Sequence, residues 1–200
     1  MRKYISHILI ISFVFIAIPI TNAAGGSKTL RSHYRSFLSL SQVQSMPNVS
    51  IREKDNWGFK GHSTINHDYN LKAINGDMVV VDSATGLMWH QSGSDDTKTW
   101  YEAKGWIKKL NKRGYAGYRD WRLPTVDEAV SLLESSKKNG NLYINPVFSR
   151  NQRWIWTGDM FEDEDGSVVA WGVNFYLGSV GRSNITFDGY VNVRPVRSMK

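Results

Sequence analysis

Residues 119–128 read Arg119-Asp120-Trp121-Arg122-Leu123-Pro124-Thr125-Val126-Asp127-Glu128, and this string predicts how the centre of the fold is built. Thr125 and Glu128 have the spacing of a capping box, in which a hydroxyl and a carboxylate satisfy backbone N–H groups at the start of a helix. Pro124 directly precedes the box and fixes the direction in which the chain enters the helix. The string therefore predicts a helix that begins at Thr125.

The apolar residues around this string predict which side of it is buried. We expect Trp121 and Leu123 to pack in the core, and Arg122 to pair with a carboxylate or with loop carbonyl groups. The helix is expected to run for two to three turns and to end near Ser135. Its apolar positions recur at helical spacing and are Val126, Ala129, Val130, Leu132 and Leu133. Each residue of the string has a local role, so we interpret the string as structural.

A second capping box lies upstream, at Thr99 and Glu102. It predicts a helix that ends at Gly114, a residue suited to the left-handed C-cap. Its apolar face is formed by Trp100, Ala103, Ile107 and Leu110. Before this helix, residues 78–81 and 87–89 are apolar runs on either side of a turn over residues 82–86, and they predict a β-hairpin.

Downstream of Arg153 the hydrophobic period changes from the helical value to two. Alternating residues predict an antiparallel meander of three to four strands; they are Trp154 and Trp156, then Val169, Trp171, Val173 and Phe175, then Ile185 and Phe187, then Val191 and Val193. Pro195 cannot donate to a strand ladder, so we expect it at an edge or a bulge. The order of elements predicts an α+β fold and argues against a parallel dinucleotide-binding fold.

The N-terminal 40 residues predict export followed by a linker. Residues 1–23 have a short basic start, an apolar run and small residues at a cleavage position, which is the pattern of a signal peptide, with an uncleaved anchor as the alternative. Residues 24–40 are expected to be a flexible linker and residues 41–200 the folded domain, in which Ser41 caps a short helix that Pro47 ends and residues 48–75 are irregular. The mature protein is expected in the periplasm or outside the cell, without a stable membrane anchor.

Composition excludes several classes of function. The chain has no cysteine, which excludes a disulfide framework, a thiolate metal site and a cysteine nucleophile. Its net charge is +7, and removal of the signal peptide leaves 23 basic against 18 acidic side chains. This mild excess predicts tolerance for acidic partners and no nucleic-acid binding.

Several motifs together resemble the Lcl C-terminal domain family, formerly a domain of unknown function, over roughly residues 76–198. They are Asp82-x-x-Thr85-Gly86-Leu87-Met88-Trp89, Trp100-x-x-Ala103, the stretch from Gly114 to Glu128, Trp154-x-Trp156-Thr157 and Val193-Arg194-x-Val196-Arg197. Residues 122–128 also resemble formylglycine-generating sulfatase-modifying domains. The resemblance implies a C-type-lectin-like fold, with two helices flanking a twisted antiparallel sheet whose N- and C-terminal strands meet.

Enzymatic chemistry of the formylglycine-generating type relies on cysteines, which this chain lacks, so it does not carry over. His33, His62, His67 and His90 lack metal-ligand spacing, and neither a nucleophile elbow nor a phosphate-binding loop is present. The acidic turn at residues 162–166 fails the calcium-loop template and is interpreted as a solvated hairpin tip. We therefore expect a protein without catalysis, cofactor or metal, and a metal-dependent enzyme is the least favoured alternative.

Surplus aromatic and arginine residues favour ligand binding. Tryptophan rings stack on sugar faces and arginine reads acidic groups, so the expected ligand-binding residues are Arg150, Arg153, Trp154, Trp171, Asn174 and Arg182. The expected ligand is a carbohydrate, an acidic polysaccharide or another surface ligand. The resemblance supports this, since the family's namesake is an adhesin that resembles a binder of sulfated polysaccharides. Two alternatives remain open: Trp154, Trp156 and Trp171 belong to the core, or the protein is a structural component that binds an envelope protein.

Overall fold

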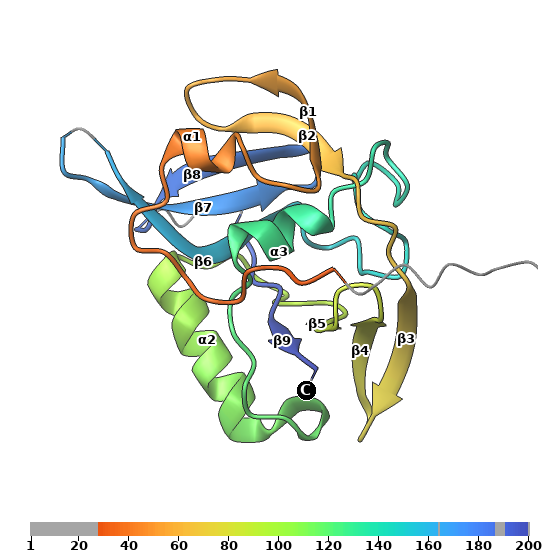
Figure 1. Cartoon of the computed structure of the whole chain (residues 1–200). Helices are drawn as coiled ribbons and strands as arrows, with labels where there is room; N and C mark the ends of the chain where they lie inside the picture. The colour runs from red at the N-terminus through yellow and green to blue at the C-terminus, as the bar shows by residue number, and fades with distance from the viewer. Residues whose placement is uncertain (1–27, 164, 187–190, 200) are drawn as a thin grey trace, which may run out of the picture.

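The computed structural model describes residues 28–163, 165–186 and 191–199, which fold into two antiparallel sheets and three α-helices (Figure 1). The α+β class is as predicted. The expected arrangement is one sheet flanked by two helices, whereas the structure has two sheets. The larger sheet has the order β1 (Val49–Lys54), β2 (Phe59–Ser63), β8 (Ser179–Asn184), β7 (Val168–Asn174) and β6 (Trp154–Glu162). The smaller has the order β3 (Tyr69–Ile74), β4 (Asp77–Asp82), β5 (Leu87–His90) and β9 (Val196–Ser198). The predicted signal peptide lies outside the described residues.

The helices begin where their capping boxes place them. They are α1 (Leu40–Val43), α2 (Trp100–Arg113) and α3 (Val126–Ser131). A 3-10 turn, η1 (Tyr115–Gly117), comes directly after α2. Gly114 ends α2 in the left-handed region at φ 75°. In α1 the cap is Ser39 rather than the expected Ser41. Helix α3 ends at Ser131, earlier than the expected Ser135, and its C-cap is Leu132, so Leu132 and Leu133 enter the core from outside the helix.

The core consists of two apolar clusters on the two faces of the larger sheet. Trp171 and Val173 of β7 pack in the cluster that includes α3, whereas Ala170 of the same strand and Trp156 of β6 pack in the cluster that includes α2. Strands β6 and β7 are therefore buried on both faces in their central parts. Alternate residues along these two strands therefore face two different apolar clusters, rather than one core and the solvent.

Several strand assignments differ from the sequence prediction. Residues 48–75, expected to be irregular, contain β1, β2 and β3. Ile185 lies beyond the end of β8, Phe187 lies outside the described residues, and Val191 and Val193 are buried outside any strand. The final strand is instead β9, which occupies an edge of the smaller sheet directly after Pro195.

The segment 28–38, which we term the strap, contacts the body instead of forming the expected flexible linker. Figure 1 shows it running past the start of α3 before it rises into α1. Arg31 donates to both carboxylate oxygens of Asp159, at 2.7 and 2.8 Å, and pairs with Asp127 of α3. Leu38 and Met160 connect the strap to β6 through a backbone hydrogen bond of 2.9 Å. These residues therefore belong to the domain.

The central string joins α3 to the smaller sheet. Arg122 donates to both carboxylate oxygens of the buried Glu128, at 2.7 Å each, and its backbone forms a bridge with Val196 of β9. The carboxylate of Glu128 also accepts the backbone N–H of Thr125 at 2.8 Å. One side chain therefore closes the capping box and neutralises a partly buried guanidinium.

Among the described residues, no helix combines the length and the apolar character that crossing a bilayer requires.

Candidate functional site

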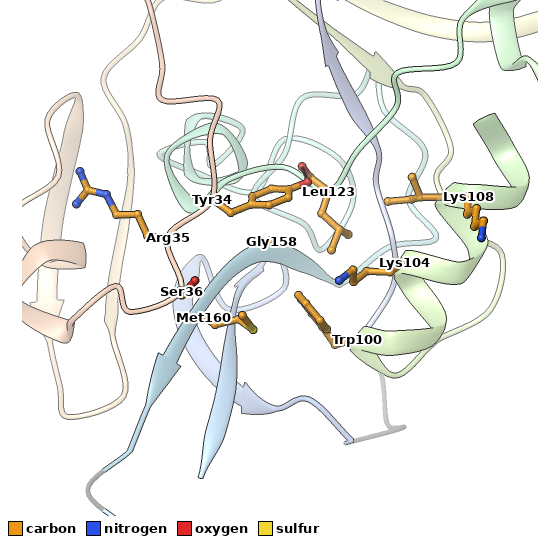
Figure 2. Close-up of a pocket in the computed structure, with 10 residues that line it drawn as sticks. Tyr34, Arg35, Ser36, Trp100, Lys104, Lys108, Leu123, Gly158 and Met160 are labelled. Atoms are coloured by element: carbon orange, nitrogen blue, oxygen red, sulfur yellow. Dashed lines mark hydrogen bonds between the residues drawn. The ribbon is translucent and has the colours of Figure 1, made fainter. Parts of the chain in front are cut away.

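A cavity of about 350 Å³ lies between the strap, α2 and β6 (Figure 2). Its volume falls within the range of about 300–1,000 Å³ that is typical of small-molecule sites. Its lining is mostly apolar, with polar groups at the rim, and the residues that line it are Tyr34, Arg35, Ser36, Trp100, Lys104, Ile107, Lys108, Leu123, Gly158 and Met160. We refer to it as the strap pocket.

Tyr34 forms one wall of the strap pocket. Its hydroxyl donates to the carbonyl of Leu123 at 2.9 Å, which holds the ring across the cavity mouth although 45% of the residue is exposed. Burial of the hydroxyl end, reinforced by the carboxylates of Glu128 and Asp159, raises the pKa of Tyr34 to about 12. The phenol therefore keeps its proton at neutral pH and remains a hydrogen-bond donor.

Gly158 allows the tyrosine ring to lie directly against β6. A Cβ atom added at this position would lie 2.1 Å from the ring of Tyr34, far inside van der Waals contact. The glycine sits where the β6–β7 register is interrupted, between Trp156 and Met160. This irregularity is also where the strap attaches, so the local break in pairing creates both the docking place and the pocket.

Trp100 forms the opposite wall and brings a cation with it. Its indole Nε1 donates to the carbonyl of Thr157 at 2.8 Å, which anchors the first turn of α2 to β6. The ammonium of Lys104 lies 4.5 Å from the centre of the Trp100 ring, a cation–π contact. Figure 2 shows Lys104 reaching toward the cavity, whereas the amine of Lys108 and the guanidinium of Arg35 point away from it.

This arrangement suits a ring-shaped ligand that carries a negative charge. Tyr34 offers its partly exposed ring to an apolar or sugar ring, and Trp100 contributes only the 6% of its surface that is exposed. Lys104 offers an ammonium to an acidic group. Sequence analysis assigned Trp100 to a helix face and Tyr34 to a linker, so it missed both walls. The alternation of lysines with apolar positions on α2 gave a signal for the cation but none for the strap opposite.

The predicted ligand-binding residues do not form one open face. Trp171 is fully buried and donates from Nε1 to the carbonyl of Leu38, so its assignment to a ligand face is corrected to the core. Arg182 is opposite Trp171 in the β7–β8 register and pairs with Asp163 at 2.6 Å. Its guanidinium also lies 5.5 Å from the ring of Trp57, an exposed residue that the sequence analysis did not select.

The other four residues lie near the far end of β6 and β7. Trp154 is half-buried and paired with Asn174, whose side chain accepts two backbone N–H groups of the following turn. Arg153 is exposed and lies over the ring of Tyr176, and Arg150 is exposed next to Gly140. Asn174 thus has a structural role, and none of the six residues lines the strap pocket.

The histidines are dispersed, and one of them is deeply buried. In the part of the chain that the structure describes, no group of three or more His, Cys, Asp or Glu side chains lies close enough to hold a metal ion. His67 lies between the carboxylate of Asp82 and the carbonyl of Ser131, at 2.7 Å from each, and ties the smaller sheet to α3. His90 stacks on Tyr115 with 4.1 Å between ring centres.

The buried position of His90 predicts a pH dependence of stability. Burial, followed by the positive charge of Arg194, lowers the pKa of His90 from 6.5 to about 3, so the folded protein holds this imidazole neutral. The unfolded chain takes up this proton as the pH falls through 6.5, whereas the folded chain does so only near pH 3. Stability from this group is therefore complete above pH 6.5 and is lost between pH 6.5 and 3, at up to about 1.4 kcal/mol per pH unit.

Urea denaturation between pH 7 and pH 4 measures this effect. The free energy of unfolding of the wild type is expected to fall more steeply with decreasing pH than that of His90→Asn, which removes the titrating group. The acidic residues contribute equally to both proteins, so the difference between the two slopes isolates His90. Parallel curves over this pH range would show that His90 titrates alike in the folded and unfolded states.

Comparison with known proteins gives one match. The family model described as the Lcl C-terminal domain matches residues 78–197. No curated protein and no solved structure matches the chain. The matched range contains Trp100, Lys104 and Gly158 but not Tyr34, so the strap wall of the pocket lies outside it.

Proposed function

The chain belongs to the Lcl C-terminal domain family, and we propose that it is an exported domain that binds an acidic carbohydrate in the strap pocket without catalysis. The observation that carries this proposal is the pairing of two aromatic walls, Tyr34 and Trp100, with the ammonium of Lys104. A pyranose ring presents C–H groups to aromatic rings, and a uronate or sulfate group on it accepts hydrogen bonds from an ammonium.

The surface of α2 supports an acidic ligand. The helix carries one acidic residue, Glu102, in its first turn, and its basic residues are Lys104, Lys108, Lys109, Lys112 and Arg113. All five basic side chains are exposed. This helix creates a positive field next to the pocket, which attracts a polyanion at low salt and weakens as salt screens it.

The finer description of the fold is also a proposal. The first hairpin of the family-matched region, β4 and β5, lies beside the last strand, β9, in one sheet. This meeting of early and late strands supports a C-type-lectin-like arrangement, to which β1, β2 and β3 are additions. In this view recognition lies on loops and edges around the scaffold, as the strap pocket does.

Export is proposed from the first 23 residues alone. Their basic start, apolar run and small residues are typical of a cleaved signal peptide. Expression of the full chain in a Gram-negative host, followed by N-terminal sequencing of the periplasmic and medium fractions, tests this. We expect a mature protein that begins near Ala24, and a full-length product in the cell fraction only would contradict export.

A glycan array followed by titration of charge variants tests the binding function. The mature protein is expected to bind carboxylated or sulfated glycans at low salt and to bind their neutral counterparts more weakly. Lys104→Gln is expected to lower affinity about fivefold to tenfold, which corresponds to the loss of one charge-assisted contact of about 1 kcal/mol. Lys112→Gln is the matched control, because it removes the same charge from the same helix and lines no part of the strap pocket.

Two results would contradict this function. Absence of binding across acidic and neutral glycans at low salt would remove the carbohydrate ligand and leave recognition of an envelope protein, which a pull-down from envelope extract detects. Equal losses for Lys104→Gln and Lys112→Gln would show a diffuse charge effect without a pocket. Loss of binding in Trp57→Ala, with Lys104→Gln unaffected, would place the site at the exposed Trp57 and Arg182 surface instead.

A further inference from the structure

A second cavity lies on the other flank of α2, between this helix and the loop that follows β5. Its volume is about 480 Å³. Helix α2 contributes Trp106, Lys109 and Arg113, which recur at helical spacing on the side away from Trp100 and Lys104. The two cavities therefore share one helix but not one residue, and we refer to the second as the His90 pocket.

His90 places an unused hydrogen-bond donor in the wall of this cavity. Its side chain is only 8% exposed, and its Nδ1 accepts the backbone N–H of Gly93 at 2.9 Å. A neutral imidazole whose Nδ1 accepts carries its proton on Nε2. Within the described residues, no group accepts a hydrogen bond from that Nε2. This Nε2 is not one of the side-chain atoms that are buried without a partner, so it faces the cavity, where a bound acceptor would take the place of water.

The remaining side chains define the chemistry of that acceptor. Lys109 supplies an ammonium at the rim, and Arg113 is held by an ion pair with Asp77 and by the ring of Tyr115, 5.1 Å away. The ring of Trp106 lies 5.8 Å from that of His90 and is half-buried. The hydrogen-bond donors of His90, Lys109 and Arg113 thus lie around the aromatic rings of the cavity. The lining contains one acidic residue, Asp95, which belongs to the exposed loop.

We infer that the His90 pocket is a second ligand site, which binds a small molecule bearing a carboxylate on a ring. The carboxylate accepts hydrogen bonds from Nε2 of His90 and from Lys109, and the ring lies against Trp106. Either an aromatic acid or a uronic acid has this chemistry. The inference does not rest on the carbohydrate proposed for the strap pocket, because no residue of that pocket takes part.

NMR titration of the mature protein with four small molecules tests this site. The probes are benzoate and glucuronate, with benzyl alcohol and glucose as their neutral counterparts, and the signals are the imidazole nitrogens of His90 and the indole N–H of Trp106. We expect saturable shifts of both signals for at least one acid, with a Kd on the order of 1 mM, as small ligands give. Its neutral counterpart is expected to bind at least fivefold more weakly.

Charge variants place the ligand within the cavity. Lys109→Gln is expected to weaken binding of the acid at least threefold, and Lys112→Gln to leave it unchanged, since Lys112 lines neither cavity. Shifts with benzoate alone identify an aromatic acid, and shifts with glucuronate alone identify a uronic acid. Absence of saturable shifts for both acids, equal binding of acid and neutral counterpart, or equal effects of the two lysine variants would overturn the site. Failure of the glycan array leaves these outcomes unaffected.

Discussion

Glu128→Ala is expected to lower the free energy of unfolding by about 3–5 kcal/mol, the cost of breaking a buried ion pair. Glu128 is fully buried and accepts two hydrogen bonds of 2.7 Å from Arg122 and one of 2.8 Å from the backbone N–H of Thr125. Alanine leaves a partly buried guanidinium without its carboxylate and an N–H group of the helix start without an acceptor. Urea denaturation followed by tryptophan fluorescence measures the loss.

Glu102→Ala provides the matched control for this prediction. Glu102 closes the same type of capping box with Thr99 at the start of α2, but its carboxylate is exposed. The two substitutions delete the same group from the same motif, so the difference between them reports burial and the ion pair with Arg122. We expect a much smaller loss for Glu102→Ala. Equal losses for the two variants would mean that capping alone explains the central string.

Asp159→Asn is expected to cost about 3 kcal/mol and to detach the strap from β6. Asp159 is fully buried, and its carboxylate accepts hydrogen bonds from the guanidinium of Arg31 and from the backbone N–H groups of Arg35 and Val126. All of these partners are donors. An amide in this place turns one acceptor into a donor and removes the negative charge that Arg31 requires.

Hydrogen exchange and denaturation together check this prediction. In Asp159→Asn the backbone N–H of Leu38, which donates to Met160, is expected to lose protection, because the strap is released. Asp127→Asn is the control, since Asp127 also pairs with Arg31 but is partly exposed, and a loss below about 1 kcal/mol is expected. Unchanged protection of Leu38 in Asp159→Asn would show that the strap is held by other contacts.

Local signals explain what the sequence could predict. The capping boxes at Thr99 and Thr125 depend on residues three positions apart, and both helices begin where these boxes lie. The hairpin of β4 and β5 likewise depends on one short turn. In contrast, β1 and β3 are edge strands without a buried residue and without a clear alternation, so residues 48–75 gave no periodic signal.

Long-range contacts explain what the sequence could not predict. Arg31 and Asp159 are 128 residues apart, and Ser- and Gly-rich composition around Arg31 suggested a linker. The strap supplies Tyr34, one of the two aromatic walls of the strap pocket, so this wall depends on the contact between Arg31 and Asp159. Trp171 shows a different error: the surplus of aromatic residues suggested a ligand face, whereas its alternation with Val169 and Val173 indicated a buried one. The structure buries Trp171, and helices α3 and α2 cover the two faces of the sheet. Periodicity identifies a strand without revealing how many of its faces are covered.

Intermolecular NOEs between the protein and an acidic oligosaccharide selected on the array test the central claim most directly. We expect NOEs from ligand ring protons to the indole of Trp100 and to the phenol ring of Tyr34, which lie on opposite walls of the strap pocket. NOEs confined to Trp57, or a bound ligand that contacts neither Tyr34 nor Trp100, would contradict the account.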